Sequence, residues 1–168
     1  MYKKVFIGSE VSIHESSQES LNYVNIGDHV KIAKRCSVYG SSQYIVNIGD
    51  YTYIGMGSIL NGYNAPLIIG SHVSIAQYVN IMVDSGPNAS EKMQRVFPVI
   101  RGAVEIGDHS WIGSSSIIMP KVKIGAYCVV GAGSFVNTSF EDFSIIGGTP
   151  AKLIRKFTSE ERRYLLSD

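Results

Sequence analysis

The stretch from Ile106 to Phe135 reads IGDHSW, IGSSSI, IMPKVK, IGAYCV and VGAGSF in consecutive blocks of six, and Val136 opens the next block. Each block starts with Ile or Val, often followed by Gly, and has a small residue at its fifth place. This period does not fit an α-helix, which repeats every ~3.6 residues, or a simple alternating strand. It fits a short strand followed by a corner, and therefore predicts a parallel β-helix with a triangular cross-section.

The same phase extends over nearly the whole chain. Triplets of blocks begin at Ile7 (a shortened one), Ile26, Ile48, Ile69, Ile106 and Ile124, which are 19, 22, 21, 37 and 18 residues apart. One coil is therefore eighteen residues long, and the excess residues must form loops at the corners. Only one excess is large, roughly Pro87 to Glu105. Long loops in compact domains are usually functional or disordered.

The six-residue phase also predicts where the cysteines and most of the histidines lie in a coil. Cys36 and Cys128 occupy the fifth place of a block, which predicts small core fillers four coils apart, too distant for a disulfide. The fourth place of the first block in a coil holds a ring in five coils: His29, Tyr51, His72, His109 and Tyr127. Because stacked coils repeat every ~4.8 Å, we expect these rings to form a ladder along one edge.

Composition excludes several classes of protein. The 168 residues suit one domain, and 15 Lys and Arg against 14 Asp and Glu leave a formal charge of +1, which disfavours nucleic acid and anionic membranes as partners. No apolar run approaches the ~18 residues of a membrane span. The start, MYKKVFIGSE, reaches polar residues too early for a secretory signal, so we expect a cytoplasmic protein.

Thr158 and Glu161 form a capping box, which predicts a helix from Ser159 to about Leu166 that caps the prism.

The region from Ile106 to Arg155 resembles the signature region of hexapeptide-repeat acyltransferases, especially the sugar O-acetyltransferases of the galactoside and maltose type and their relatives in polysaccharide biosynthesis. The matching features are IGDHSWIG, a Pro one coil edge later, GAGSFV, and GTPAK with a following Arg. The resemblance implies an all-β fold, a left-handed parallel β-helix of about six coils with a protruding loop and a short C-terminal helix. A single domain would span residues 1–168, with the β-helix over about 5–150 and the helix over about 158–166.

The resemblance also implies a function. It predicts an acetyl-CoA-dependent O-acetyltransferase that acts on a sugar or a surface-polysaccharide precursor, in a homotrimer with acetyl-CoA in the groove between neighbouring chains. Relatives usually carry a catalytic His in the long loop, and this chain has none from Asp84 to Ser90. Two alternatives therefore stay open: N-acetylation of a nucleotide-linked amino sugar, and an inactive scaffold that holds partners.

Two residues are candidates for the base that accepts the acceptor's proton. His109 lies beside Trp111 in the coil next to the long loop, and His29 and His72 are weaker candidates; the alternative is that all three only pack in the ladder. Asp84 could orient a sugar hydroxyl or act as a weak base, and its alternative role is to form a turn. An amine acceptor needs no such base before attack, which keeps N-acetylation open.

The remaining candidates would bind the cofactor. The resemblance places cofactor contacts at Ser114, Ala132, Asn137 and Thr138, with Lys152 and Arg155 near the adenosine 3′-phosphate and Trp111 as a wall of the groove. Relatives often have Thr-Lys where this chain has Asn137 and Thr138, and the loss of that Lys weakens one phosphate contact. Alternatively, Lys152 and Arg155 belong to a basic tail that is only solvated, and Trp111 is an aromatic residue at an interface between chains. No metal is expected, because three convergent histidines are lacking. We expect the long loop to cover the acceptor site of the neighbouring chain.

Overall fold

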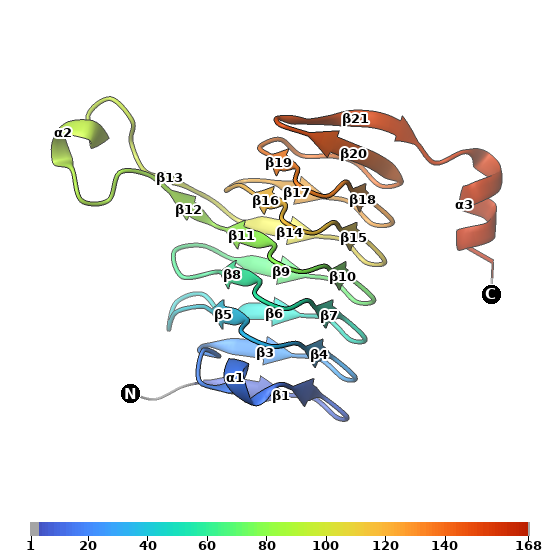
Figure 1. Cartoon of the computed structure of the whole chain (residues 1–168), viewed down its shortest axis with the longest axis horizontal. Coiled ribbons are helices and arrows are strands. Elements are labelled where there is room, and N and C mark those ends of the chain that lie inside the picture. Colours follow the sequence, from blue (N-terminus) through green and yellow to red (C-terminus); the bar gives the residue numbers. More distant parts are fainter. Residues whose placement is uncertain (1–3, 168) are drawn as a thin grey trace.

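Three parallel sheets form the sides of a triangular prism in the computed structural model, which describes residues 4–167 (Figure 1). Residues 1–3 and 168, which belong to the expected domain and include part of the lysine-containing start, lie outside the described residues. Sheet A contains, in order, β1 (Val5–Ile7), β3 (Val24–Ile26), β6 (Val46–Ile48), β9 (Leu67–Ile69), β14 (Val104–Ile106) and β17 (Lys123–Ile124).

The other two sides are built in the same way. Sheet B contains β2 (Ser12–Ile13), β4 (Lys31–Ile32), β7 (Tyr53–Ile54), β10 (Ser74–Ile75), β15 (Trp111–Ile112), β18 (Val129–Val130), β20 (Ser144–Gly148) and the antiparallel β21 (Ala151–Lys156). Sheet C contains β5 (Ser37–Tyr39), β8 (Ile59–Asn61), β11 (Asn80–Met82), β16 (Ile117–Ile118) and β19 (Phe135–Val136). Corner 1 joins sheets A and B, corner 2 joins B and C, and corner 3 joins C and A.

The strand register follows the six-residue phase of the sequence. In sheet A, each residue that opens a coil pairs with its counterpart in the next coil, from Ile7 up to Ile124. The corresponding rows in sheets B and C are also in register and point into the prism, where nearly all of their Ile, Leu and Val side chains are buried. The predicted left-handed parallel β-helix of about six coils is confirmed.

The two cysteines are confirmed as core fillers. Both are free and buried. The Sγ of Cys36 donates to the carbonyl oxygen of Gly55 at 3.2 Å, and the Sγ of Cys128 donates to that of Glu141 at 3.2 Å. Burial raises the pKa of both thiols. They therefore stay protonated and fill space between coils.

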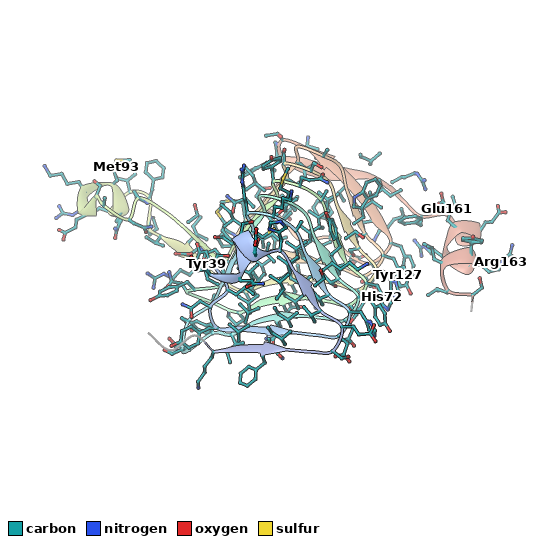
Figure 2. The ribbon with its side chains drawn as sticks, turned by 60° about the horizontal axis from the view of Figure 1, so that its bottom comes forward. Tyr39, His72, Met93, Tyr127, Glu161 and Arg163 are labelled. Carbon is teal, nitrogen blue, oxygen red and sulfur yellow. The ribbon has the colours of Figure 1, made fainter. Side chains whose placement is uncertain are left out.

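The ring ladder is confirmed at corner 1. His29, Tyr51, His72, His109 and Tyr127 stack with ring centroids 4.4 to 4.9 Å apart. A sixth ring, Phe143, continues the ladder at 5.1 Å, although the six-residue phase is broken there. Every ring residue has φ between +54° and +59°, the left-handed conformation that turns the chain at this corner. Figure 2 shows His72 and Tyr127 on the side of the prism that faces the C-terminal helix.

All larger loops leave the prism at corner 3. Residues 83–103, called the arm below, contain the antiparallel pair β12 (Asp84–Ser85) and β13 (Ile100–Arg101) and the single helical turn α2 (Glu91–Gln94) at the tip (Figure 1). Two shorter loops, 40–45 and 62–66, project from the same corner in lower coils. The first coil lacks a third strand, and α1 (Glu15–Gln18) takes its place.

The C-terminal helix forms as predicted but does not cap the prism. The capping box of Thr158 and Glu161 starts α3 (Ser159–Leu165). Figure 1 shows that the hairpin of β20 and β21 covers the last coil, while α3 projects at the side. Its link to the prism includes Arg162, whose guanidinium lies 5.0 Å from the centroid of Phe143 at the end of the ring ladder. The expectation of a capping helix was therefore wrong, because the hairpin already occupies the end. Within residues 4–167, no helix has the length and apolar character needed to cross a membrane.

The inward rows predict where substitutions will destabilise the fold. Ile75 is 0% exposed and lies between Ile54 and Ile112. We expect Ile75→Ala to lower the free energy of unfolding by about 2–5 kcal/mol, because neighbouring coils cannot collapse into the cavity without breaking their register. Ser74→Ala, on the solvent side of the same strand, is the control and should change it by less than ~0.5 kcal/mol. Urea unfolding at fixed protein concentration measures both; equal effects would contradict the assignment of the core.

Candidate functional site

Asp84 lies at the root of the arm, where the chain leaves sheet C. Its carboxylate accepts hydrogen bonds from Asn61 Nδ2 at 3.2 Å and from Asn64 Nδ2 at 2.8 Å, one at each oxygen. All three side chains are half-buried. Donors to both oxygens fix the orientation of the carboxylate group. The Asp84 carboxylate is therefore held in one orientation by two neighbouring amides.

Tyr39 completes a polar group around Asp84. It stands one coil below Asn61, which is itself in register with Met82. Burial, and secondarily the charge of Asp84, raises the pKa of the Tyr39 hydroxyl. The phenol therefore keeps its proton near this carboxylate. Asp84, Asn61, Asn64 and Tyr39 are called the Asp84 cluster below. Figure 2 shows Tyr39 on the side of the prism from which the arm projects.

A pocket of ≈ 560 Å³ opens at the root of the arm. It is lined by Ile100, Met119, Pro120, Lys121, Phe135, Asn137, Thr138 and Ser139. Ile100 pairs with Ser85, the residue after Asp84, so the arm itself carries one wall of this pocket, while the Asp84 cluster is not part of its lining. Its volume is in the usual range for small-ligand sites, about 300–1000 Å³. The arm-root pocket thus contains two of the expected cofactor residues, Asn137 and Thr138.

Two further cofactor candidates lie across sheet C at corner 2. The Oγ of Ser114 donates to Gln77 Oε1 at 3.0 Å, and Ala132 follows one coil above and is exposed. Between the two corners, the outward side chains of Ile117 and Phe135 pair across β16 and β19. Ser114, Ala132, Asn137 and Thr138 therefore border one face, the upper half of sheet C.

The structure separates His109 and Trp111 from this face. Trp111 is 55% exposed on the outward side of sheet B, in register with Ser74 and Val129. His109 belongs to the ladder at corner 1, with His72 stacked on one side of its ring and Tyr127 on the other. Asp84 stands at corner 3. Within one chain, the two candidate bases thus lie at different corners and do not meet.

The two basic candidates lie on β21, and one of them is engaged in an ion pair. The Arg155 guanidinium makes a bidentate contact with Glu161, at 2.7 Å and 2.9 Å, and the Glu161 carboxylate also accepts from the Thr158 N–H at 2.7 Å. These donors hold the pKa of Glu161 down to about 2. Arg155 therefore anchors the start of α3. Lys152 is exposed on the same strand.

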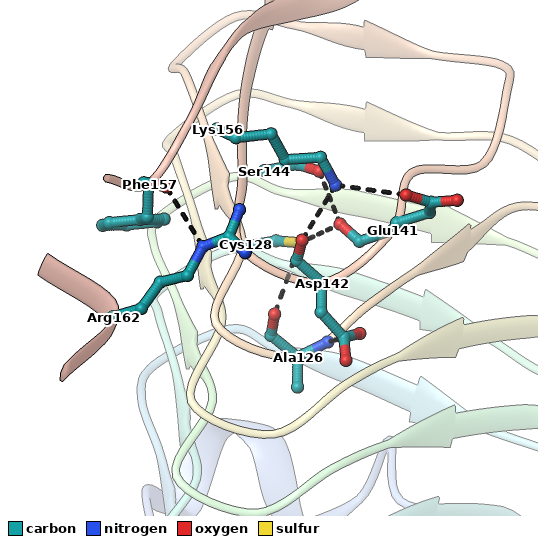
Figure 3. A network of polar contacts seen from close by, with 8 residues as sticks. All are labelled: Ala126, Cys128, Glu141, Asp142, Ser144, Lys156, Phe157 and Arg162. Carbon is teal, nitrogen blue, oxygen red and sulfur yellow. Dashed lines mark hydrogen bonds and ion pairs between the residues drawn. The ribbon is translucent and has the colours of Figure 1, made fainter. Parts of the chain in front are cut away.

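The junction at the top of corner 1 also forms a pocket, of ≈ 680 Å³, but it contains none of the expected site residues. Figure 3 shows how its polar groups are satisfied: Lys156 Nζ contacts Glu141 Oε2 at 3.5 Å and the Asp142 carbonyl oxygen at 2.9 Å, and Arg162 Nε donates to the Phe157 carbonyl oxygen at 3.0 Å. These contacts tie the hairpin and α3 to the last coil. In the part of the chain that the structure describes, no three His, Cys, Asp or Glu side chains group as metal ligands.

Sequence reasoning missed the partners of the candidate residues. Asn61 could have been found, because the coil register aligns it with Met82, two residues before Asp84. Asn64 sits in a corner loop outside the period, and Gln77 belongs to no motif. The partner of Arg155, Glu161, was recognised only as a capping residue.

Comparison with known proteins agrees with the fold. The family described as bacterial transferase hexapeptide (six repeats) matches residues 103–138. A galactoside O-acetyltransferase from Escherichia coli is 28% identical over 161 residues, which are 95% of this chain and 76% of that protein. A chloramphenicol acetyltransferase from Escherichia coli is 46% identical over 67 residues, 40% of this chain, and this match spans about a third (32%) of that relative's length.

Solved structures show the same architecture. A mutant of AntD, an N-acyltransferase from Bacillus cereus in complex with dTDP-4-amino-4,6-dideoxyglucose and coenzyme A, superposes with a TM-score of 0.77 at 25% identity, covering 95% of this chain and 89% of AntD. A hexapeptide-repeat-containing acetyltransferase from Vibrio cholerae, complexed with acetyl coenzyme A, gives a TM-score of 0.64 at 27% identity over 90% of this chain and 70% of that protein. The period, the coil register, the family match over residues 103–138 and these likenesses agree in supporting a hexapeptide-repeat acyltransferase.

Proposed function

We propose that this protein transfers an acetyl group from acetyl-CoA to a hydroxyl of a sugar or a surface-polysaccharide precursor in the cytoplasm. One observation carries the proposal: Asp84, oriented by Asn61 and Asn64, stands at the root of the arm, and the same arm carries Ile100, one wall of a pocket lined by Asn137 and Thr138. Acyl transfer to a hydroxyl requires a fixed proton acceptor and a site for the ligand, and the root of the arm carries a candidate for each. The likeness to a galactoside O-acetyltransferase over 95% of this chain supports the same reaction.

The proposed reaction is a direct attack on the thioester. The acceptor hydroxyl attacks the acetyl carbonyl carbon while Asp84 takes its proton, so that a C–O bond forms. The C–S bond then breaks and coenzyme A leaves as the thiol, with the proton returned to sulfur. Backbone N–H groups lining the groove would stabilise the oxyanion of the intermediate. Asn61 and Asn64 act as positioning residues, because they hold the carboxylate and not the substrate.

Acetyl-CoA is proposed to lie along the upper half of sheet C. Ser114 and Ala132 would contact it at one edge and Asn137 and Thr138 at the other. Lys152 and Arg155 would approach its 3′-phosphate, where positive charge is needed for a dianion.

A homotrimer is part of the proposal. Trp111 is on the outward side of sheet B and not on sheet C of the same chain, so it can line this groove only from a neighbouring chain. Cyclic assembly of three prisms would bring such faces together. The arm, which projects well beyond its own prism, would then reach over the acceptor site of the neighbour (Figure 1).

A second acceptor, the amine of a nucleotide-linked amino sugar, is favoured by the Asp84 cluster itself. The Asp84 carboxylate, which two amide donors hold in place, can equally take a proton from an attacking amine. The same carboxylate suits an amine, which loses its proton only after attack. The likeness to AntD, crystallised with an amino-sugar nucleotide, points the same way.

The acceptor is decided by direct assay. With acetyl-CoA present, release of free thiol should depend on a galactoside or maltose and not on a nucleotide-linked amino sugar, and the product should carry an ester. An amide product with the amino sugar alone would replace the first proposal by the second. Calorimetry that detects no acetyl-CoA binding would overturn both and leave the scaffold as the remaining function.

Substitution separates the two candidate bases. We expect Asp84→Asn to lower kcat by about 100-fold or more, because the amide cannot accept the proton. His109→Phe is the matched test at the other corner and should leave kcat within about twofold, since a phenyl ring still stacks between His72 and Tyr127. Steady-state kinetics on both variants, with thermal unfolding as a check on folding, gives the answer; a large loss in His109→Phe alone would assign the base to His109.

The Arg155–Glu161 pair predicts a change in cofactor affinity. Glu161→Gln keeps a capping-box residue but removes the negative charge, so Arg155 becomes available to a phosphate. We expect the affinity for coenzyme A to rise by about threefold, and that for 3′-dephospho-coenzyme A to stay unchanged. Glu160→Gln, on the exposed first turn of α3, is the control.

The pH dependence of this effect follows from the lowered pKa of Glu161. Because the folded-state pKa is about 2, against 4.5 for an unperturbed Glu, the carboxylate is charged throughout the usual assay range. Its contribution to holding α3 is therefore fully present above pH 4.5 and is lost as the pH falls through about 2. Calorimetric titrations between about pH 6 and 8 should show a constant difference between variant and parent; no difference for either ligand would remove Arg155 from the phosphate site.

A further inference from the structure

A second groove lies on the outward face of sheet A, among the lower coils. It has a volume of ≈ 660 Å³ and is lined by Phe6, Asn25, Gln43, Tyr44, Ile45, Asn47 and Pro66. The residues come from β1, β3 and β6, which stack at the N-terminal end of the prism in Figure 1, and from the two short loops of corner 3. The groove shares no lining residue with the arm-root pocket.

The floor of the sheet A groove is a pair of stacked amides. Asn25 and Asn47 occupy paired positions on β3 and β6. Asn25 Nδ2 donates to Asn47 Oδ1 at 3.3 Å, and Asn47 Nδ2 donates to the Ile45 carbonyl oxygen at 3.2 Å. Each amide nitrogen carries two hydrogens, so Asn25 and Asn47 each keep one N–H hydrogen that these bonds do not use. Asn25 Oδ1 accepts no hydrogen bond from residues 4–167. The floor thus offers both donors and an acceptor to a ligand.

The walls are aromatic and apolar. Phe6 is 58% exposed at one end of the groove, and Tyr44 and Ile45 are half-buried at its side. Tyr44 is held by its loop, because its N–H donates to the Ser41 carbonyl oxygen at 3.2 Å and its own carbonyl accepts from the Ser41 N–H at 2.7 Å. The loop of residues 40–45 therefore has a fixed main chain at Tyr44, whose side chain lines the groove together with the amides.

The groove carries no charge. None of its seven lining residues is ionisable at neutral pH, in a chain with 15 basic and 14 acidic residues. A phosphate or carboxylate ligand would lack a cation to pair with. A sugar ring matches this lining: its C–H face packs on an aromatic ring, and its hydroxyls both donate to and accept from side-chain amides.

We propose that the sheet A groove binds a neutral oligosaccharide. Its volume lies within the range of small-ligand sites, about 300–1000 Å³. Tyr44 and Phe6 would pack against sugar rings, while Asn25, Asn47 and Gln43 bond the hydroxyls. This binding requires no acetyl-CoA and does not rest on the proposed transfer reaction.

The test measures binding of three neutral probes, maltohexaose, cellohexaose and chitopentaose (fully N-acetylated), by calorimetry and saturation-transfer NMR without acetyl-CoA. At least one should bind with a Kd below about 1 mM. Tyr44→Ala and Asn47→Ala should each weaken that binding by about tenfold. Tyr53→Ala removes a tyrosine that is 39% exposed on sheet B, and this control should leave the Kd unchanged.

Three results would overturn the proposal. In the first, none of the three probes binds. In the second, Tyr53→Ala weakens binding as much as Tyr44→Ala. In the third, Tyr44→Ala shifts the sedimentation coefficient, which would make this face an interface between copies of the chain. The readout is binding in the absence of acetyl-CoA, so a failure of the acetyl-transfer proposal is seen separately.

Discussion

Burial of branched side chains between successive coils is the constraint on which the rest of the structure depends. A three-residue strand is too short to be stable by itself, so each coil exists only because the next one covers its inward Ile, Leu or Val. Main-chain hydrogen bonds between coils keep these rows in register. A side chain at a given place in the six-residue block is therefore forced to the same side of the prism in every coil, which is why rings gather at corner 1.

The same constraint decides where a functional site can form. Corners 1 and 2 hold tight turns whose ring and main-chain contacts repeat from coil to coil, and neither gives rise to an extra loop between the second and last coils. Corner 3 takes all the additional residues: the arm and the two short loops. The groups outside the repeat thus gather at one edge. Both the Asp84 cluster and the side of the sheet A groove are built from these insertions, on a frame that the period keeps rigid.

Much of the fold was predictable from the sequence, and the site only in part. The period gave the coil length, the register of Ile7 through Ile124 and five of the six ladder rings, because each follows from side-chain direction in a repeated unit. Phe143 was not predicted as the sixth ring, because the segment NTSFEDF breaks the period. The contact of Asn64 with Asp84 and the position of α3 were not predicted for a similar reason, because both depend on contacts of non-repeating segments. The pairing of Arg155 with Glu161 depends on a turn between strand and helix that no spacing rule describes.

The last two regular coils follow each other without any inserted loop, since Ile106 and Ile124 are 18 residues apart and pair directly. A prism made of such interchangeable layers can lengthen or shorten by one whole layer while every remaining side chain keeps its orientation. The distance between the arm and the C-terminal hairpin is thus adjustable in steps of one layer, about 4.8 Å. Gain or loss of whole layers would let such a chain match donors or acceptors of different length without a new core.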